Sequence, residues 1–151
     1  MPLAATSILA LAALLGAWLD LASRRLPNWL CLATAVAGLG FAGFAAGPGA
    51  LLSPLAHASL SLLVGMALFR FGWIGGGDAK FYTACAAWFA LPQAFALLLW
   101  VSLAGLILVI VWFGYRRATR ARRSAEQELF ASVPYGVAVA AGAVVARVLV
   151  S

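Results

Sequence analysis

Long apolar runs separated by short polar stretches make up almost the whole chain of 151 residues. At about 1.5 Å of helix per residue, a run of roughly 20 residues crosses the hydrocarbon core of a bilayer. Five runs reach or approach that length: Pro2–Ala22, Trp29–Ala46, Leu51–Phe71, Gln93–Tyr115 and Val133–Val150. A sixth run, Ala79–Leu91, is shorter and fits either a membrane-spanning helix or a re-entrant segment. The pattern predicts an all-α fold.

The composition excludes a water-soluble domain. Hydrophobic residues make up 66% of the chain and charged residues only 9%, whereas soluble domains carry about 25% charged residues. Too few polar residues remain to cover a surface in water, so lipid is the solvent for most of it. The net charge of +6 comes from basic residues in the polar stretches, and it reports membrane topology rather than nucleic-acid binding. Cys31 and Cys85 lie in apolar runs and are interpreted as small buried hydrophobes.

The basic residues decide the number of spans. Six crossings place nearly all of them on one side of the membrane: Arg24, Arg25, Arg70, Lys80, Arg116, Arg117, Arg120, Arg122 and Arg123. Because Lys and Arg favour the cytoplasmic side, we predict a polytopic membrane protein with six transmembrane helices and both termini outside. Residues 1–151 are expected to form a single membrane-embedded domain, with Arg116–Ser132 as a solvated, partly helical cytoplasmic loop.

Only two aspartates occur in the chain, Asp20 and Asp78, and six crossings place both at cytoplasmic helix ends. Acidic groups are rare in membrane helices and often mark a functional site. Each also has a structural interpretation, because Asp78 could cap a helix that begins at Ala79 and Asp20 could pair with Arg24. These two residues alone leave both interpretations open.

Three glycines, Gly75, Gly76 and Gly77, come directly before Asp78. Glycine adopts backbone conformations that other residues avoid, and it lets another backbone approach closely. The run therefore fits either a hinge or a loop that binds an extended peptide. It lacks the GK[ST] ending of a phosphate-binding loop.

Three motifs together resemble those of a known family. GGGDAK at Gly75–Lys80 contains a GxGD signature, Asp20 is followed by Arg24-Arg25-Leu26-Pro27-Asn28, and a Pro-Tyr-Gly element lies within Val133–Gly136. In this combination the chain resembles the type IV prepilin peptidases, which are GxGD intramembrane aspartic peptidases. Pro27 leads almost directly into the second apolar run, so the chain is similar to the short form associated with Flp-type tight-adherence pili. The cytoplasmic insert with paired CxxC motifs is absent, which argues against N-methyltransferase activity.

The resemblance implies an aspartic endopeptidase of the bacterial inner (cytoplasmic) membrane whose active site faces the cytoplasm. Its expected partners are the lipid bilayer and prepilin or pseudopilin substrates, which carry a short basic leader, a glycine before the cut and an apolar helix after it. No metal and no organic cofactor is expected. The resemblance assigns catalysis to Asp20 and Asp78, and we expect substrate binding by Gly75, Gly76, Gly77, Lys80, Arg24, Pro27 and Asn28.

Two carboxyl groups suit peptide hydrolysis, because the ionised group activates water while the protonated group donates to the scissile carbonyl. Helix dipoles favour Asp78 as the base and Asp20 as the acid, whereas the cation of Arg24 acts against this assignment. A small proton-coupled transporter is the alternative, since paired membrane acids also relay protons, and a structural subunit is a further one. The transporter is less favoured because the acids lie at one face and the halves show no evident repeat. His57 is expected to be a hydrogen-bonded helix residue away from both aspartates.

Overall fold

The computed structural model describes residues 2–119 and 133–150. Within these residues it contains six α-helices, two short 3₁₀ turns and no strand, which confirms the all-α prediction. The helices are α1 (Pro2–Ser23), α2 (Asn28–Ala46), α3 (Leu52–Arg70), α4 (Gly76–Ala86), α5 (Ala94–Thr119) and α6 (Tyr135–Val150). The turns η1 (Pro48–Leu51) and η2 (Leu91–Gln93) precede α3 and α5.

In the part of the chain that the structure describes, four stretches are long and apolar enough to cross a membrane: Leu3–Ser23, Asn28–Ala46, Pro48–Arg70 and Leu91–Tyr115. The other two helices are shorter, with 16 residues in α6 and 11 in α4. At about 1.5 Å per residue, α4 is roughly 16 Å long, or about half the thickness of the hydrocarbon core. The prediction of six spans is therefore supported only in part.

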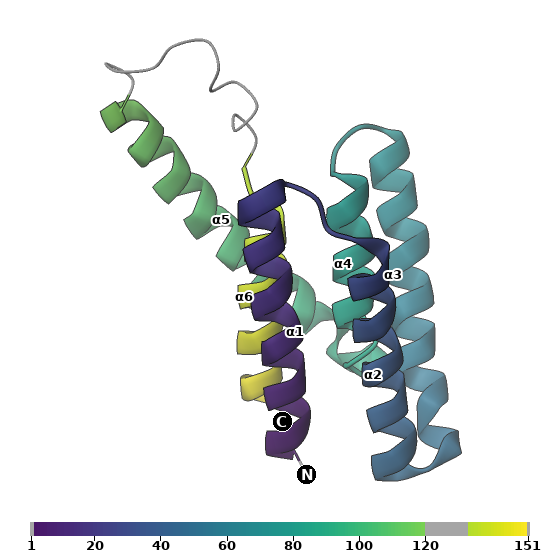
Figure 1. The fold of residues 1–151 in the computed structure, drawn as a ribbon. Helices are drawn as coiled ribbons and strands as arrows, with labels where there is room; N and C mark the ends of the chain where they lie inside the picture. The colour runs from purple at the N-terminus through teal and green to yellow at the C-terminus, as the bar shows by residue number, and fades with distance from the viewer. Residues whose placement is uncertain (1, 120–132, 151) are drawn as a thin grey trace.

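Successive helices run in alternate directions (Figure 1). The helices α1, α3 and α5 end where α2, α4 and α6 begin, and the chain starts and finishes at the opposite end of the bundle (Figure 1). We call the end of the bundle where α1 and α3 finish the loop end. It holds the connections at residues 24–27 and 71–75. Charged motif residues near these connections therefore share one end of the molecule.

The helices form two groups of three. In one group α4 packs against α2 and α3, and in the other α1 and α5 pack against α6. The groups meet where α4 contacts α6 and where α1 contacts α2. The core lies around α4, in which Phe81 and Cys85 are fully buried, while large apolar residues such as Leu11 and Leu63 are exposed on the outside. Such an outer surface fits a protein whose solvent is lipid.

The position of α4 differs from the prediction. The helix begins at Gly76 instead of Ala79 and ends at Ala86 instead of Leu91. The chain then turns inside the bundle, and side chains from other helices bond its polar groups. His57 Nδ1 donates to the carbonyl oxygen of Phe89 at 3.1 Å, and Arg147 donates to that of Trp88 at 3.1 Å. These bonds explain the early end of α4, and the one at His57 confirms that it is a hydrogen-bonded helix residue.

The arginine-rich segment is described only in part. The helix α5 continues through Arg117 to Thr119, so the start of this segment is helical, as predicted. The predicted solvated loop lies largely in residues 120–132, which are outside the described part of the chain.

Candidate active site

Asp20 lies in the last turn of α1 and is only 7% exposed. Its carboxyl group faces the first turn of α6, where a Cβ atom on Gly136 would lie 2.8 Å from Asp20 Oδ2. Oδ2 itself is buried and has no hydrogen-bond partner among the described residues. Glycine at position 136 therefore makes the space that Asp20 occupies.

Asp78 lies in the first turn of α4, and Gly75 precedes that helix. A Cβ atom on Gly75 would lie 2.7 Å from Asp78 Oδ2, so this glycine also makes room for a carboxyl group. Gly75 has a φ of −72°, and the described glycines with positive φ are Gly47 and Gly72. The glycine run therefore needs no unusual backbone angle here: Gly76 and Gly77 belong to the first turn of α4, and Gly75 leaves space for the carboxyl group of Asp78.

Both aspartates line one pocket with a volume of about 440 Å³, which we call the carboxylate pocket. Asp20 comes from the α1, α5 and α6 group and Asp78 from the other group, so the pocket lies between the two groups at the loop end. The remaining lining residues are Arg24, Leu26, Gly75, Gly76, Gly77, Val133 and Tyr135. The fold thus brings together two acids that are far apart in the sequence.

Arg24 closes one side of this pocket in an unusual backbone conformation. Its φ is +53°, and it is the sole described residue other than glycine with a positive φ. Its N–H donates to the carbonyl oxygen of Asp20 at 3.0 Å and so ends α1, a position where glycine is common. The guanidinium lies 5.2 Å from the ring centroid of Trp112 on α5. Backbone strain of this kind often occurs at functional sites.

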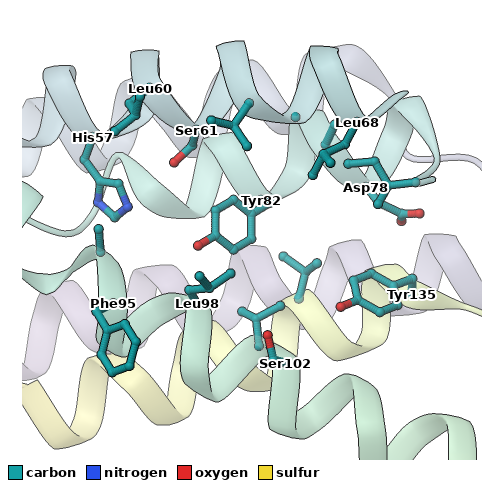
Figure 2. Close-up of a pocket in the computed structure, with 17 residues that line it drawn as sticks. His57, Leu60, Ser61, Leu68, Asp78, Tyr82, Phe95, Leu98, Ser102 and Tyr135 are labelled. Atoms are coloured by element: carbon teal, nitrogen blue, oxygen red, sulfur yellow. The ribbon is translucent and has the colours of Figure 1, made fainter. Parts of the chain in front are cut away.

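A second cavity, also of about 440 Å³, begins at Asp78 and is almost entirely apolar. Asp78 and Tyr135 lie at one end, His57 and Phe95 lie at the other, and Tyr82 lies between them (Figure 2). Its walls come from α3, α4, α5 and α6 and include Leu60, Ser61, Val64, Leu98 and Ser102. We call this cavity the apolar groove. Asp78 and Tyr135 line both cavities, so the two cavities adjoin each other.

Not all of the residues expected to bind substrate lie in the carboxylate pocket. Arg24 and the glycines Gly75, Gly76 and Gly77 do line it. Three others are absent from its lining: Pro27, Asn28 and Lys80. Lys80 Nζ donates to Asn28 Oδ1 at 3.1 Å, which joins the start of α4 to the start of α2. Pro27 directly precedes α2, and its carbonyl oxygen accepts the N–H of Leu30.

Sequence reasoning did not assign a role to Tyr135 or Gly136, although both belong to the Pro-Tyr-Gly element. Tyr135 lines both cavities, and Gly136 makes room for Asp20. The Pro-Tyr-Gly element was the sequence signal for these two residues. Their role in the site became visible only once α6 was seen to pack beside the end of α1. Within the described residues, no group of three His, Cys, Asp or Glu side chains could hold a metal ion.

The fold and this site define a class: an all-helical membrane protein with two carboxyl groups in one pocket of an apolar bundle. A model of the type IV leader peptidase family matches residues 7–110, more than half of the chain, and the chain belongs to this family. It is therefore a protease of the leader peptidase or prepilin peptidase type. The matched range contains Asp20 and Asp78 and ends before α6. No curated protein and no solved structure matched the chain.

Proposed function

We propose that this chain is an intramembrane aspartic endopeptidase that uses Asp20 and Asp78 to remove the short basic leader from Flp-like prepilins. Family membership supports the reaction class. The observation that carries the assignment of residues is the carboxylate pocket, because the only two aspartates of the chain both line it. The proposal also treats residues 1–151 as one peptidase domain, since both helix groups contribute to this pocket.

The pair would hydrolyse the peptide bond by general acid–base catalysis. The ionised carboxylate takes a proton from water, and the water oxygen attacks the scissile carbonyl carbon while the protonated carboxyl donates to the carbonyl oxygen. When the tetrahedral intermediate collapses, the C–N bond breaks and the leaving nitrogen takes the proton that the first carboxylate removed from water. One hydroxyl group of the intermediate returns its proton to the second carboxylate, which restores the pair. Two carboxyl groups in one pocket readily hold a single proton between them, because ionising both places like charges close together.

The helix ends give Asp20 and Asp78 more similar surroundings than the sequence indicated. Asp78 lies in the first turn of α4, where the helix dipole favours an anion. Asp20 lies in the last turn of α1, where the dipole disfavours one, but it also faces the first turn of α6. These two influences on Asp20 oppose each other. The dipole argument for Asp20 as the acid therefore loses its support, and the proposal is for the pair as a unit.

Substrate binding is proposed for the part of the glycine run and loop end that lines the carboxylate pocket. A Cβ atom on Gly77 would meet nothing closer than Leu26 at 3.6 Å, an ordinary contact, so the packing of the chain itself does not require glycine there. A substrate backbone that approaches this position closely would require it. Arg24 lines the same pocket beside Asp20. Because Lys80 and Asn28 bond one another outside this lining, we propose a positioning role for them and for Pro27.

Cleavage is proposed to occur at the cytoplasmic face of the bacterial inner membrane. Arg24, Arg25, Arg70 and Lys80 all lie at or beside the loop end, and basic residues favour the cytoplasmic side. The connection between α1 and α2 comprises only residues 24–27, which leaves no cytoplasmic insert between these helices. This short connection supports the Flp-type form without N-methyltransferase activity.

Coexpression with a Flp-type prepilin, followed by N-terminal sequencing of the mature pilin, tests the proposal. We expect cleavage by the wild type and none by Asp20→Asn or Asp78→Asn. Asparagine keeps the size of the side chain but cannot exchange a proton in this way, so both variants should reach the membrane in normal amounts. Full activity in either variant would remove the aspartic mechanism. An unprocessed prepilin beside correctly inserted wild-type protein would instead favour the transporter or the structural subunit.

A further inference from the structure

The apolar groove has the length of a short helical segment. Along α3 it extends from His57 to Leu68, which corresponds to about 16 Å or three turns of helix. Leu60, Val64 and Leu98 line it and are each about half exposed. Large apolar side chains therefore form its two rims, with α3 on one side and α5 on the other.

The groove opens sideways between the two helix groups. On one side α3 packs against α4, and on the other α5 packs against α6, but α5 makes few direct contacts with α3 or α4. The helix α5 also leans away from α3 and α4 towards the loop end (Figure 1). A membrane-embedded molecule can therefore enter the groove laterally from the lipid without crossing the bundle.

The inner end of the groove leads directly to the candidate catalytic groups, because Asp78 and Tyr135 line both cavities. The ring of Tyr135 packs over α5, where a Cβ atom on Gly105 would lie 3.0 Å from its Cε2 atom. Tyr135 thus lies at the junction between an apolar channel and a polar pocket. A polypeptide with one bond beside the aspartates therefore has the groove next to it, on the other side of Asp78 and Tyr135.

We infer that the apolar groove receives the apolar helix of the substrate, the segment that follows the cleaved bond; this inference rests on the proposed function. At hydrocarbon depth a backbone must satisfy its own hydrogen bonds, so a segment in the groove is helical. In this arrangement the substrate helix ends near Tyr135, and the substrate polypeptide continues past Asp78 into the carboxylate pocket. A lipid acyl chain would match the apolar walls, but it would not explain why the groove adjoins the pocket that holds the two aspartates.

The walls carry small residues where a helix would lie closest. Ser61 on α3 and Ser102 on α5 line the groove from opposite sides (Figure 2). Small residues allow close packing of helices in membranes, and serine hydroxyls can bond between helices. The groove therefore combines apolar rims with small positions on both walls, which is typical of a helix-binding surface rather than of a wide lipid-filled gap.

Adjacent leucines on α5 provide a matched test. Leu98 and Leu99 are both exposed, but only Leu98 lines the groove. We expect Leu98→Trp to raise KM for a full-length Flp-type prepilin about tenfold, and Leu99→Trp to leave it unchanged. On α3, Val64→Trp and Leu63→Trp form a second pair with the same expected contrast. A soluble peptide that spans the cleavage site but lacks the apolar helix should be cleaved equally by all four variants.

Photocrosslinking identifies the occupant directly. A photoreactive phenylalanine analogue at position 98 of the Asp78→Asn variant should give an adduct with the helix of coexpressed prepilin, and the same analogue at position 99 should not. Adducts with lipid alone, or with a second copy of the chain, would overturn the inference. Equal KM values for Leu98→Trp and Leu99→Trp would overturn it too. If the wild type cleaves neither the prepilin nor the peptide, the proposed function fails instead, which separates the two failures.

Discussion

At its N-terminal end α4 presents Asp78 to an open pocket, whereas beyond its C-terminal end the polar groups of the chain are bonded and hidden. His57 and Arg147 donate to the carbonyl oxygens of Phe89 and Trp88. At the other end, Asp20 lines the same pocket as Asp78, and its buried Oδ2 atom has no hydrogen-bond partner among the described residues. Both ends lie within the bundle, but only the N-terminal end places carboxyl groups beside a pocket.

The difference shows how a half-length helix can serve both stability and function in a membrane protein. Unpaired polar groups are unfavourable away from water, so the end that carries no chemistry is satisfied by side chains from α3 and α6. An unsatisfied buried carboxylate oxygen is uncommon in native structures and requires an explanation. The proposed explanation is a water and a substrate carbonyl between Asp20 and Asp78.

The largest expected effect comes from filling the space beside Asp20. In Gly136→Ala the new Cβ atom would lie 2.8 Å from Oδ2 and 2.9 Å from Cγ, so the carboxyl group must move. A displacement of about 1 Å in a catalytic group can reduce turnover about 100-fold. We expect a kcat loss of that size for Gly136→Ala, and a similar loss for Gly75→Ala at Asp78. Prepilin cleavage rates in purified membranes measure it.

A control separates this displacement from a general effect of losing glycine. Gly40 lies in α2 and a Cβ atom there would meet nothing within 4 Å, so Gly40→Ala should keep full activity. If Gly136→Ala is as active as Gly40→Ala, the close contact between α6 and Asp20 does not control catalysis.

Substitutions at the opposite end of α4 should change the stability of the protein and not its catalytic rate. His57→Leu and Arg147→Met each leave a buried carbonyl oxygen without its side-chain donor. We expect each to lower the free energy of unfolding by about 1–2 kcal/mol, with kcat of the folded protein near the wild-type value. Thermal unfolding in detergent micelles, followed by cleavage assays below the transition, measures both quantities. Leu149→Met, at an exposed position of α6, is the control and should change neither.

Sequence reasoning located the helices well because lipid requires long apolar runs, and five of the predicted runs closely match α1, α2, α3, α5 and α6. It failed at the end of α4. Residues 87–91 are as apolar as a membrane helix, and the turn there depends on His57 and Arg147, which are distant in the sequence. A pattern of hydrophobic positions cannot reveal a helix end that tertiary hydrogen bonds determine.

The site was predictable to the same degree. Alternating helices place Asp20 and Asp78 at one end of the bundle, and the carboxylate pocket contains both. The contact between Asp20 and Gly136 was not predictable, because it depends on how α6 packs against α1. The same packing changes the helix-dipole argument for Asp20. Lys80 and Asn28 belong to the two aspartate motifs of the sequence, but the hydrogen bond between them becomes apparent only in the folded chain.

A smaller effect is expected where the region beyond α4 contacts α2. Trp88 Nε1 donates to the carbonyl oxygen of Thr34 at 2.9 Å, and the Trp88 ring stacks on Phe41. Thr34 lies inside α2, so its carbonyl also accepts a helical hydrogen bond and is not left unpaired in Trp88→Phe. We therefore expect a loss of only about 0.6 kcal/mol, a typical value for a hydrogen bond between membrane helices. Thermal unfolding measures it, and a loss as large as that of His57→Leu would contradict this ranking.

The smallest effect is expected for the hydrogen bond from Lys80 to Asn28 near the open end of α4. Both residues are exposed, and exposed bonds of this kind contribute only a few tenths of a kcal/mol. If the pair only positions α4 against α2, then Lys80→Met, Asn28→Ala and the double variant should share one small change in KM, because each removes the same bond. If Lys80 instead binds the substrate directly, Lys80→Met should raise KM in the Asn28→Ala background as well. Steady-state cleavage of a prepilin by the four proteins of this cycle distinguishes the two roles. Equal KM values for the two single variants and the double variant would show that Lys80 only supports the position of α4. A further increase of KM in the double variant would show that Lys80 binds the substrate.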